Sequence, residues 1–175
     1  QFRHFGSERE PGYSARMKKV KEMASGSVVA RNRQATHNYE ILETYEAGLV
    51  LKGTEVKSLR EGKVSLKESF ASIERGEAWL IGCHISPYSH GHRDNPDPLR
   101  KRKLLLHRAE INRLMGKTQE RGLTLVPLQV YFKDGRAKVA MGLARGKKLH
   151  DKRQTLRERE ARREMDRVVR ARQVG

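Results

Sequence analysis

The apolar residues of this chain come in short segments that alternate with charged residues, and no long apolar run occurs in the sequence. Alternation with a period of two residues is typical of half-buried β-strands. The pairs Arg75-Gly76 and Asp134-Gly135 each separate two such segments and therefore predict hairpin turns. The segments that we expect to form strands are 39–51, 70–73, 78–81, 123–132 and 139–143. The sequence thus predicts a mainly β fold with some helices and an antiparallel sheet.

Closure of this sheet into a small barrel would hide the strand edges. The hydrophobic fraction is 36% and the charged fraction 34%, so the supply of core-forming side chains is modest. A β-sandwich gives a similar strand pattern, and the pattern alone leaves both architectures open. We expect the folded domain to span residues 27–144.

Two segments have a helical pattern instead. Residues 104–122 form the longer one, with Gly122 as a C-terminal cap. Its residues at helical spacing are Ile111, Leu114, Met115 and Thr118. A shorter helix is expected to begin with Thr54 as its N-cap and to end at Gly62. Within the strand that follows, Pro127 lacks an amide hydrogen and predicts an edge or a bulge.

The charge of the chain narrows its classes of partner. Thirty-eight Lys and Arg stand against 21 Asp and Glu, a net charge of +17. A nucleic acid is the commonest partner of such a field, because neutralised phosphates release counterions. An anionic membrane surface is the alternative, but no basic helix with a broad apolar face is evident. A transmembrane protein is excluded, since a span needs about 20 apolar residues. The single Cys83 is consistent with a reducing cytoplasm.

Both ends of the chain differ from the middle. Residues 1–26 are predicted to be a flexible basic leader. The chain begins at Gln1 and Met17 offers an alternative start, which leaves open a foreign origin for part of this leader. Residues 145–175 carry twelve Lys or Arg and five Asp or Glu. This basic tail has helical propensity but little apolar surface to bury, so we expect it to become helical on binding RNA.

Enzyme chemistry finds little support in the sequence. The cysteine, histidines and aspartates of residues 83–97 match no paired zinc-ligand spacing. We therefore expect no metal, no cofactor and no catalytic residue. The strongest enzymatic alternative is a metal-dependent nuclease that uses Glu46, Glu55 and Lys57. A structural ribosomal protein is the other alternative, and it would accompany all ribosomes.

Several motifs in register resemble one known family. They are Asn32-Arg33, His37-Asn38-Tyr39, Tyr45-Glu46-Ala47-Gly48, the string from Lys52 to Arg60, Arg102-Lys103-Leu104-Leu105-Leu106, Gly146-Lys147-Lys148 and Asp151-Lys152-Arg153. Between about Ala30 and Arg163 the chain resembles the SsrA-binding protein family, also called small protein B or SmpB. One departure is Thr36, which stands where that family often has Arg or Lys.

The resemblance implies an oligonucleotide-binding-type β-barrel and an RNA-binding adaptor. Such an adaptor binds the tRNA-like domain of transfer-messenger RNA (tmRNA) and is a monomer without enzymatic activity. Together with elongation factor Tu, the adaptor and its tmRNA enter a stalled ribosome in the cytoplasm. The resemblance further implies that the C-terminal tail lies near the decoding centre, in the empty messenger channel, and is helical there.

The resemblance also carries over two sets of residues. Those expected to bind RNA are Asn32, Arg33, His37, Glu46, Arg102, Lys103 and Leu105. Those expected at the decoding centre and messenger channel are Lys147, Lys148, His150, Asp151, Lys152 and Arg153. Leu105 would pack on an exposed base, and Arg102 and Lys103 would hold phosphates. Glu46 would accept hydrogen bonds from a base or hold an arginine in position.

Overall fold

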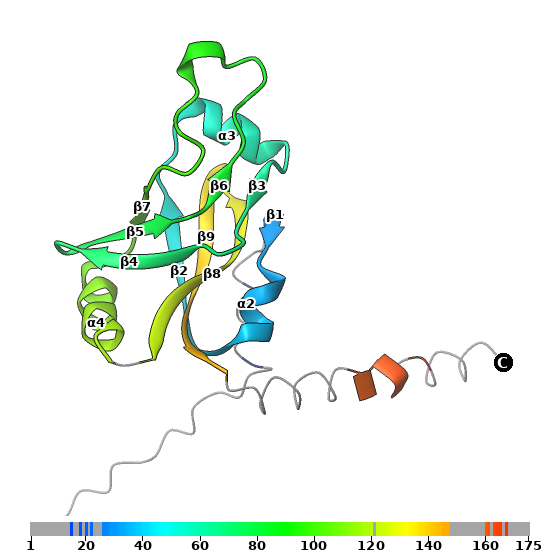
Figure 1. Ribbon diagram of the computed structural model, residues 1–175, viewed down its shortest axis with the longest axis vertical. Coiled ribbons are helices and arrows are strands. Elements are labelled where there is room, and N and C mark those ends of the chain that lie inside the picture. The colour runs from blue at the N-terminus through cyan, green and yellow to red at the C-terminus, as the bar shows by residue number, and fades with distance from the viewer. Residues whose placement is uncertain are drawn as a thin grey trace, which may run out of the picture.

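The computed structural model describes residues 26–120 and 122–147 continuously, together with positions 15, 18, 20, 22, 160, 161, 163–165 and 167 (Figure 1). The strands are β1 (Ser27–Arg31), β2 (Tyr39–Leu49), β3 (Val64–Ser65), β4 (Phe70–Glu74), β5 (Glu77–Ile81), β6 (His84–Ile85), β7 (Arg102–Leu105), β8 (Leu123–Lys133) and β9 (Arg136–Gly146). The helices are α2 (Arg33–Asn38), α3 (Gly53–Arg60), the short 3-10 helix η1 (His92–Asp94) and α4 (Arg108–Thr118).

Six antiparallel strands close into a ring. The order β8-β4-β5-β7-β2-β9 is completed by pairing of β9 with β8, and β1 adds to β8 outside the ring. The longest ladders join β9 to β2 and to β8, with Met141 opposite both Tyr45 and Pro127. The predictions of a mainly β fold and of an antiparallel barrel are therefore confirmed. Figure 1 shows α3 at one end of this barrel and α4 near the other.

A bulge at Pro127 divides strand β8, which pairs with three other strands. The register of β8 against β9 shifts between Pro127 and Gln129. On the other side of β8, β4 pairs at Leu125 and β1 pairs from Gln129 to Phe132. Proline has no amide hydrogen for the ladder, so a register break at this residue costs no hydrogen bond. The predicted bulge at Pro127 is confirmed.

Both predicted hairpins close through two-residue turns. Arg75 and Gly76 have φ of 52° and 75°, and Asp134 and Gly135 have 51° and 71°. Positive φ at both central residues is the geometry whose twist matches that of paired strands. Glu74 accordingly pairs with Glu77, and Lys133 pairs with Arg136.

Both predicted helices begin at other residues than expected. The longer one, α4, starts at Arg108 and not at Leu104, because Leu104 belongs to β7 and pairs with Ala78 and Leu49. The N-cap of α3 is Lys52 and not Thr54. The hydroxyl of Thr54 instead donates to the carbonyl of Asp94 at 3.2 Å. No helix in the described part of the chain is long and apolar enough to cross a membrane.

Two apolar clusters hold the domain together. The larger one fills the barrel and includes Leu59, Leu80 and Leu104. The smaller one lies outside the barrel, around Ile41, and includes Val20 at 2% exposure. The carbonyl of Val20 also accepts a hydrogen bond of 2.6 Å from the side-chain amide of Gln129. At this position the predicted flexible leader is therefore packed against the domain.

At its other end the domain reaches slightly further than predicted. Strand β9 runs to Gly146, beyond the expected boundary at residue 144. Lys147 is tied to the domain as well, since its amide donates to the carbonyl of Asn38 at 2.9 Å. The tail positions that the structure describes, 160, 161, 163–165 and 167, are helical.

Candidate nucleic-acid interface

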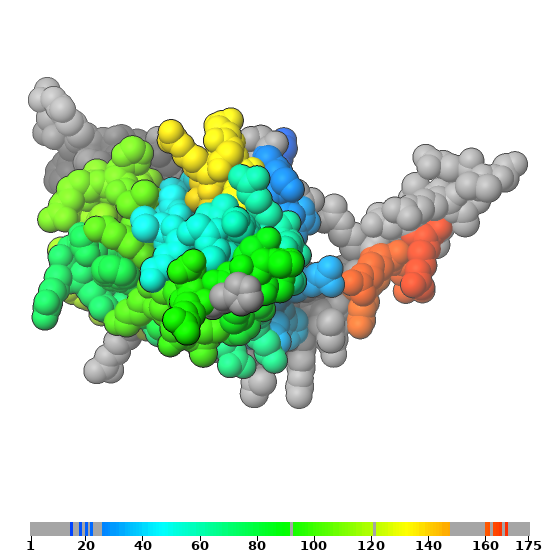
Figure 2. Space-filling model, turned by 90° about the horizontal axis from the view of Figure 1, so that it is seen from above, coloured from blue at the N-terminus to red at the C-terminus, as the bar shows by residue number. Residues whose placement is uncertain are grey.

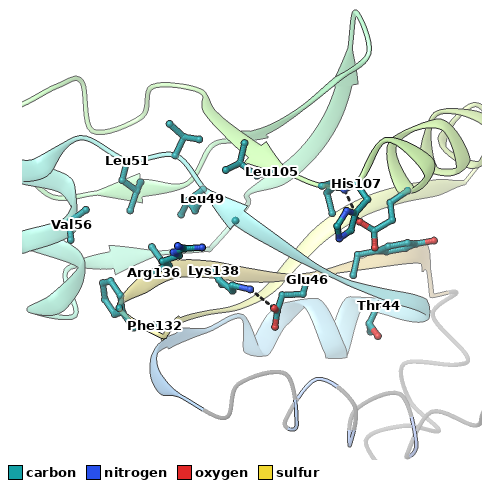
Figure 3. A pocket seen from close by; sticks show the side chains of 17 residues that line it. Thr44, Glu46, Leu49, Leu51, Val56, Leu105, His107, Phe132, Arg136 and Lys138 are labelled. Atoms are coloured by element: carbon teal, nitrogen blue, oxygen red, sulfur yellow. Dashed lines mark hydrogen bonds and ion pairs between the residues drawn. The ribbon is translucent and has the colours of Figure 1, made fainter.

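An open groove of about 860 Å³ runs along one side of the barrel (Figure 3). Strands β2, β7 and β9, the end of β8 and the helix α3 all contribute to it. Its lining combines apolar side chains, among them Leu49, Leu51, Val56, Leu105 and Phe132, with the charged or polar Glu46, His107, Glu110, Arg136 and Lys138. Apolar surface beside cations is a combination that suits bases and phosphates together.

Glu46 is the centre of a charged cluster on one wall of the groove. Its carboxylate accepts hydrogen bonds of 2.6 Å from the ammonium of Lys138 and from the hydroxyl of Tyr131. The ammonium of Lys133 lies 3.4 Å from the same carboxylate. The residues that Glu46 holds are thus two lysines and a tyrosine, and not an arginine. Figure 3 shows the bond to Lys138.

The ionisation of Glu46 follows from these contacts. Burial alone would raise its pKa, but the hydrogen bonds from Lys138 and Tyr131 and the charges of Lys138 and Lys133 outweigh it. The net result is a pKa below the ordinary value of 4.5. The carboxylate is therefore ionised at neutral pH and holds Lys138, which lines the groove, as well as Lys133.

We predict that the free energy of unfolding falls as the pH drops below about 4.5 and through the lowered pKa of Glu46. The sign follows because the folded state binds the proton less readily than the unfolded state. Urea unfolding at pH 7 and at stepwise lower pH measures this free energy of unfolding. The Glu46→Gln variant should lose part of this pH dependence; an unchanged dependence would show that Glu46 contributes nothing to it.

Leu105 lies at the end of β7, the strand that pairs with β2, and it also lines the groove. Its side chain is 56% exposed and lies beside the apolar lining of the groove. Gly48 of β2 is its neighbour, and a Cβ at that glycine would lie 3.2 Å from the Cβ of Leu105. A larger residue at position 48 would therefore displace Leu105. The arrangement presents an exposed apolar side chain on which an exposed base can pack.

Arg102 lies inside the protein and not at the groove. Its guanidinium is fully buried and donates to Glu55 at 2.9 Å and to the carbonyls of Cys83, Pro98 and Arg100. The expectation that Arg102 holds a phosphate is therefore corrected, because its hydrogen bonds are all directed to the protein. The neighbouring Lys103 is more exposed and forms an ion pair with Glu77.

Glu55 is equally committed to the interior. It is 3% exposed and accepts hydrogen bonds from Arg100, Arg102 and the amide of Lys52. Burial raises its pKa, but these donors outweigh that effect and leave the pKa below 4.5. Glu55 and Glu46 are thus bound to different partners, which disfavours a shared metal. In the continuous part of the structure and its isolated described positions, no three His, Cys, Asp or Glu side chains are grouped to hold a metal.

Three further predicted RNA-binding residues lie on or beside α2, away from the groove. The side-chain amide of Asn32 donates to the carbonyls of Leu66 and Pro127, at 3.2 and 3.1 Å, and its oxygen caps α2 through the amide of Ala35. Asn32 therefore positions this helix. Arg33 is exposed on the first turn of the helix, and the ring of His37 lies 3.0 Å from the side chain of Asn38.

Lys147 is the first of the predicted tail residues, and it is also held at α2. Its ammonium donates to the carbonyl of Thr36 at 3.2 Å. The other predicted tail residues, Lys148, His150, Asp151, Lys152 and Arg153, lie outside the described residues.

The comparisons with known proteins agree with these features. A family model described as "SmpB protein" matches residues 29–171. The SsrA-binding protein of Desulforudis audaxviator is 64% identical over 142 residues, which are 81% of this chain and 93% of that protein. The chain belongs to the SmpB family. This is a family of RNA-binding proteins, and the prediction that the chain is not an enzyme is thereby confirmed.

Further matches in the SmpB family extend over most of the chain. The SsrA-binding protein of Geobacillus kaustophilus is 60% identical over 148 residues, or 85% of this chain and 96% of that protein. A solved structure described as "tmRNA-SmpB: a journey to the center of the bacterial ribosome" contains a similar chain. It is 61% identical, has a TM-score of 0.60, and the match covers 69% of this chain and 85% of that one.

The sequence reasoning missed several lining residues of the groove. Arg136 and Lys138 are two residues apart on β9 and therefore point to the same side of the sheet. Phe132 precedes the hairpin turn, and its ring lies 5.4 Å from the guanidinium of Arg60 on α3. The alternation of Arg136 and Lys138 with apolar residues was a usable signal for the first two. Arg60 and Phe132 lie far apart in the sequence, so no local pattern indicates their contact.

Proposed function

We propose that this member of the SmpB family is an RNA-binding adaptor of trans-translation. In this role it binds the tRNA-like domain of tmRNA and delivers it to stalled ribosomes. Support comes from the family itself, from relatives named SsrA-binding protein, and from the similar chain in a tmRNA–SmpB structure. The net charge of +17 suits an RNA partner.

The groove carries the assignment of the binding site. Glu46 on β2 and Leu105 on β7, two of the residues carried over from the family resemblance, lie on adjacent strands and both line one groove. In the proposed complex Leu105 packs on an exposed base of the tRNA-like domain. Lys138 and Lys133, held by Glu46, bind its phosphates.

The remaining steps follow from the family resemblance. The protein acts as a monomer, and elongation factor Tu accompanies the RNA into the ribosome. The tail, including Lys148, His150 and Arg153, then occupies the empty messenger channel near the decoding centre. Its twelve basic residues suit a channel lined by RNA.

Replacing Leu105 by alanine is expected to weaken binding of the tRNA-like RNA about tenfold, since burying a leucine side chain against a base is worth about 1.5–3 kcal/mol. Leu99→Ala is the matched control, because Leu99 is also 56% exposed but does not line the groove. A gel shift with labelled tRNA-like RNA measures both. Equal affinities of the two variants would contradict the assignment of the groove.

The Glu46→Ala variant tests how the carboxylate acts. If Glu46 serves to hold Lys138 and Lys133, its removal weakens RNA binding although the protein gains net positive charge. If Glu46 only repels phosphate, its removal tightens binding. We expect weaker binding in the same gel shift, and tighter binding would overturn the proposed role of Glu46.

A further inference from the structure

The loop between β6 and β7 presents two rings beside a lysine. The rings of Tyr88 and His90 have centroids 5.4 Å apart and are tilted by 51°. The ammonium of Lys57, on α3, lies 5.2 Å from the centroid of Tyr88. Tyr88 is half-buried, while Lys57 and His90 are exposed. Figure 2 shows this end of the molecule from above, with the loop in green at the surface.

The backbone of the loop fixes the position of Tyr88. The side chain of Asn95 accepts from the amide of Tyr88 and donates to its carbonyl, both at 2.9 Å. The amide of Gly91 also donates to that carbonyl, at 2.9 Å. A Cβ at Gly91 would lie 2.8 Å from the amide group of Asn95, so a larger residue there would displace the side chain that holds Tyr88. These three hydrogen bonds hold the backbone of Tyr88.

The ends of the loop are anchored in the protein. The amide of Ile85 donates to the carbonyl of Pro98, and the same carbonyl accepts from the buried guanidinium of Arg102. At the tip, the hydroxyl of Thr54 on α3 donates to Asp94. These bonds fasten the loop to the helix that carries Lys57. The two rings and the lysine therefore form one preorganised surface, which we call the Tyr88 platform (Tyr88, His90 and Lys57).

The charge and place of the Tyr88 platform favour RNA as its partner. Three basic residues are exposed here, Lys57 and Arg60 on α3 and Arg93 in the loop. They outnumber the two exposed acidic residues of the loop, Asp94 and Asp97. The same helix contributes Val56 to the groove. Aromatic rings with an adjacent cation are the means by which proteins hold unpaired bases and their phosphates.

We propose that the Tyr88 platform is a second RNA contact of this protein, separate from the groove. An unpaired base stacks on the ring of Tyr88 with its edge against His90, and Lys57 binds the phosphate next to it. This proposal rests on the proposed function in one respect only, namely that the protein binds RNA. The base belongs either to tmRNA or to ribosomal RNA, and the experiment has an arm for each.

The test compares full-length variants in filter binding to the tRNA-like RNA and to small ribosomal subunits. Tyr88→Ala should weaken binding about 5- to 50-fold in one of the two arms, as expected for the loss of one stacked base. Tyr88→Phe keeps the ring and should bind within about twofold. Phe70→Ala is the matched control, because Phe70 is 43% exposed and lies on β4. Urea unfolding of each variant checks that the fold is retained.

Lysine 57 provides an independent variant. Lys57→Ala should weaken binding in the same arm as Tyr88→Ala, and Lys57→Arg should restore it. Unchanged binding of both alanine variants in both arms would overturn the Tyr88 platform, and so would a loss equal to that of Phe70→Ala. The proposed function is tested separately, because it fails if the unaltered chain does not bind the tRNA-like RNA, whatever the Tyr88 and Lys57 variants do.

Discussion

Replacing Arg102 by methionine is expected to lower the free energy of unfolding by about 3–5 kcal/mol, the usual effect of removing one partner of a buried ion pair. The fully buried guanidinium neutralises Glu55 and satisfies three backbone carbonyls, those of Cys83, Pro98 and Arg100. Methionine fills similar space but leaves the carboxylate and these oxygens with fewer donors. Urea unfolding followed by the fluorescence of Trp79, the single tryptophan, measures the change.

The next residue along the chain provides the control. Lys103 is also basic and also paired, but its ion pair with Glu77 is 39% and 44% exposed. Surface pairs are worth about 0–1 kcal/mol, so Lys103→Met should have little effect on the free energy of unfolding. Similar losses in the two variants would contradict the view that burial of Arg102 sets the difference. It would then be the charge of the segment, and not the interior network, that matters.

Arg102 also shows where sequence reasoning fails. Arg102 and Lys103 are adjacent basic residues, and the sequence offers no means to tell that one is fully buried and the other partly exposed. The difference arises because neighbouring strand residues point to opposite faces, and because Glu55, 47 residues away, meets Arg102 inside. Long-range pairing of this kind cannot be derived from one segment.

The start of α4 has a similar explanation. Three consecutive leucines, Leu104 to Leu106, fit a helix as well as a strand by their own pattern. Leu104 belongs to a strand because it pairs with Ala78 and Leu49 on the neighbouring strands. In contrast, the turn at Asp134-Gly135 and the bulge at Pro127 were predicted correctly, because backbone preferences of single residues determine them.

The predicted site residues also differ in whether they lie at the groove or support the fold. Glu46 and Leu105 came from motif resemblance, and the structure places both at the groove. Asn32 came from the same resemblance, yet its side chain is occupied in holding α2 to Leu66 and Pro127. Motifs thus identify residues that matter without distinguishing contact from support. Only the partners of each side chain make that distinction.

A chain that ends at Lys147 is expected to bind the tRNA-like RNA within about threefold of the full chain, because few phosphate contacts are lost from the groove. The groove is lined by residues up to Lys138, and β9 is complete at Gly146. The same truncated chain should fail to support tagging of stalled nascent chains, because the proposed function assigns occupation of the messenger channel to the tail. A translation reaction on a message without a stop codon, with added tmRNA, measures tagging.

A second variant separates the sequence of the tail from its charge. In this variant residues 148–175 are shuffled, which keeps the composition and the net charge. If the tail acts through particular residues such as His150 and Arg153, the shuffled chain binds the RNA normally but does not restore tagging. Restoration would mean that positive charge alone suffices, and normal tagging by the truncated chain would remove the tail from the mechanism. Loss of RNA binding on truncation would instead place part of the binding site in the tail, contrary to the assignment of the groove.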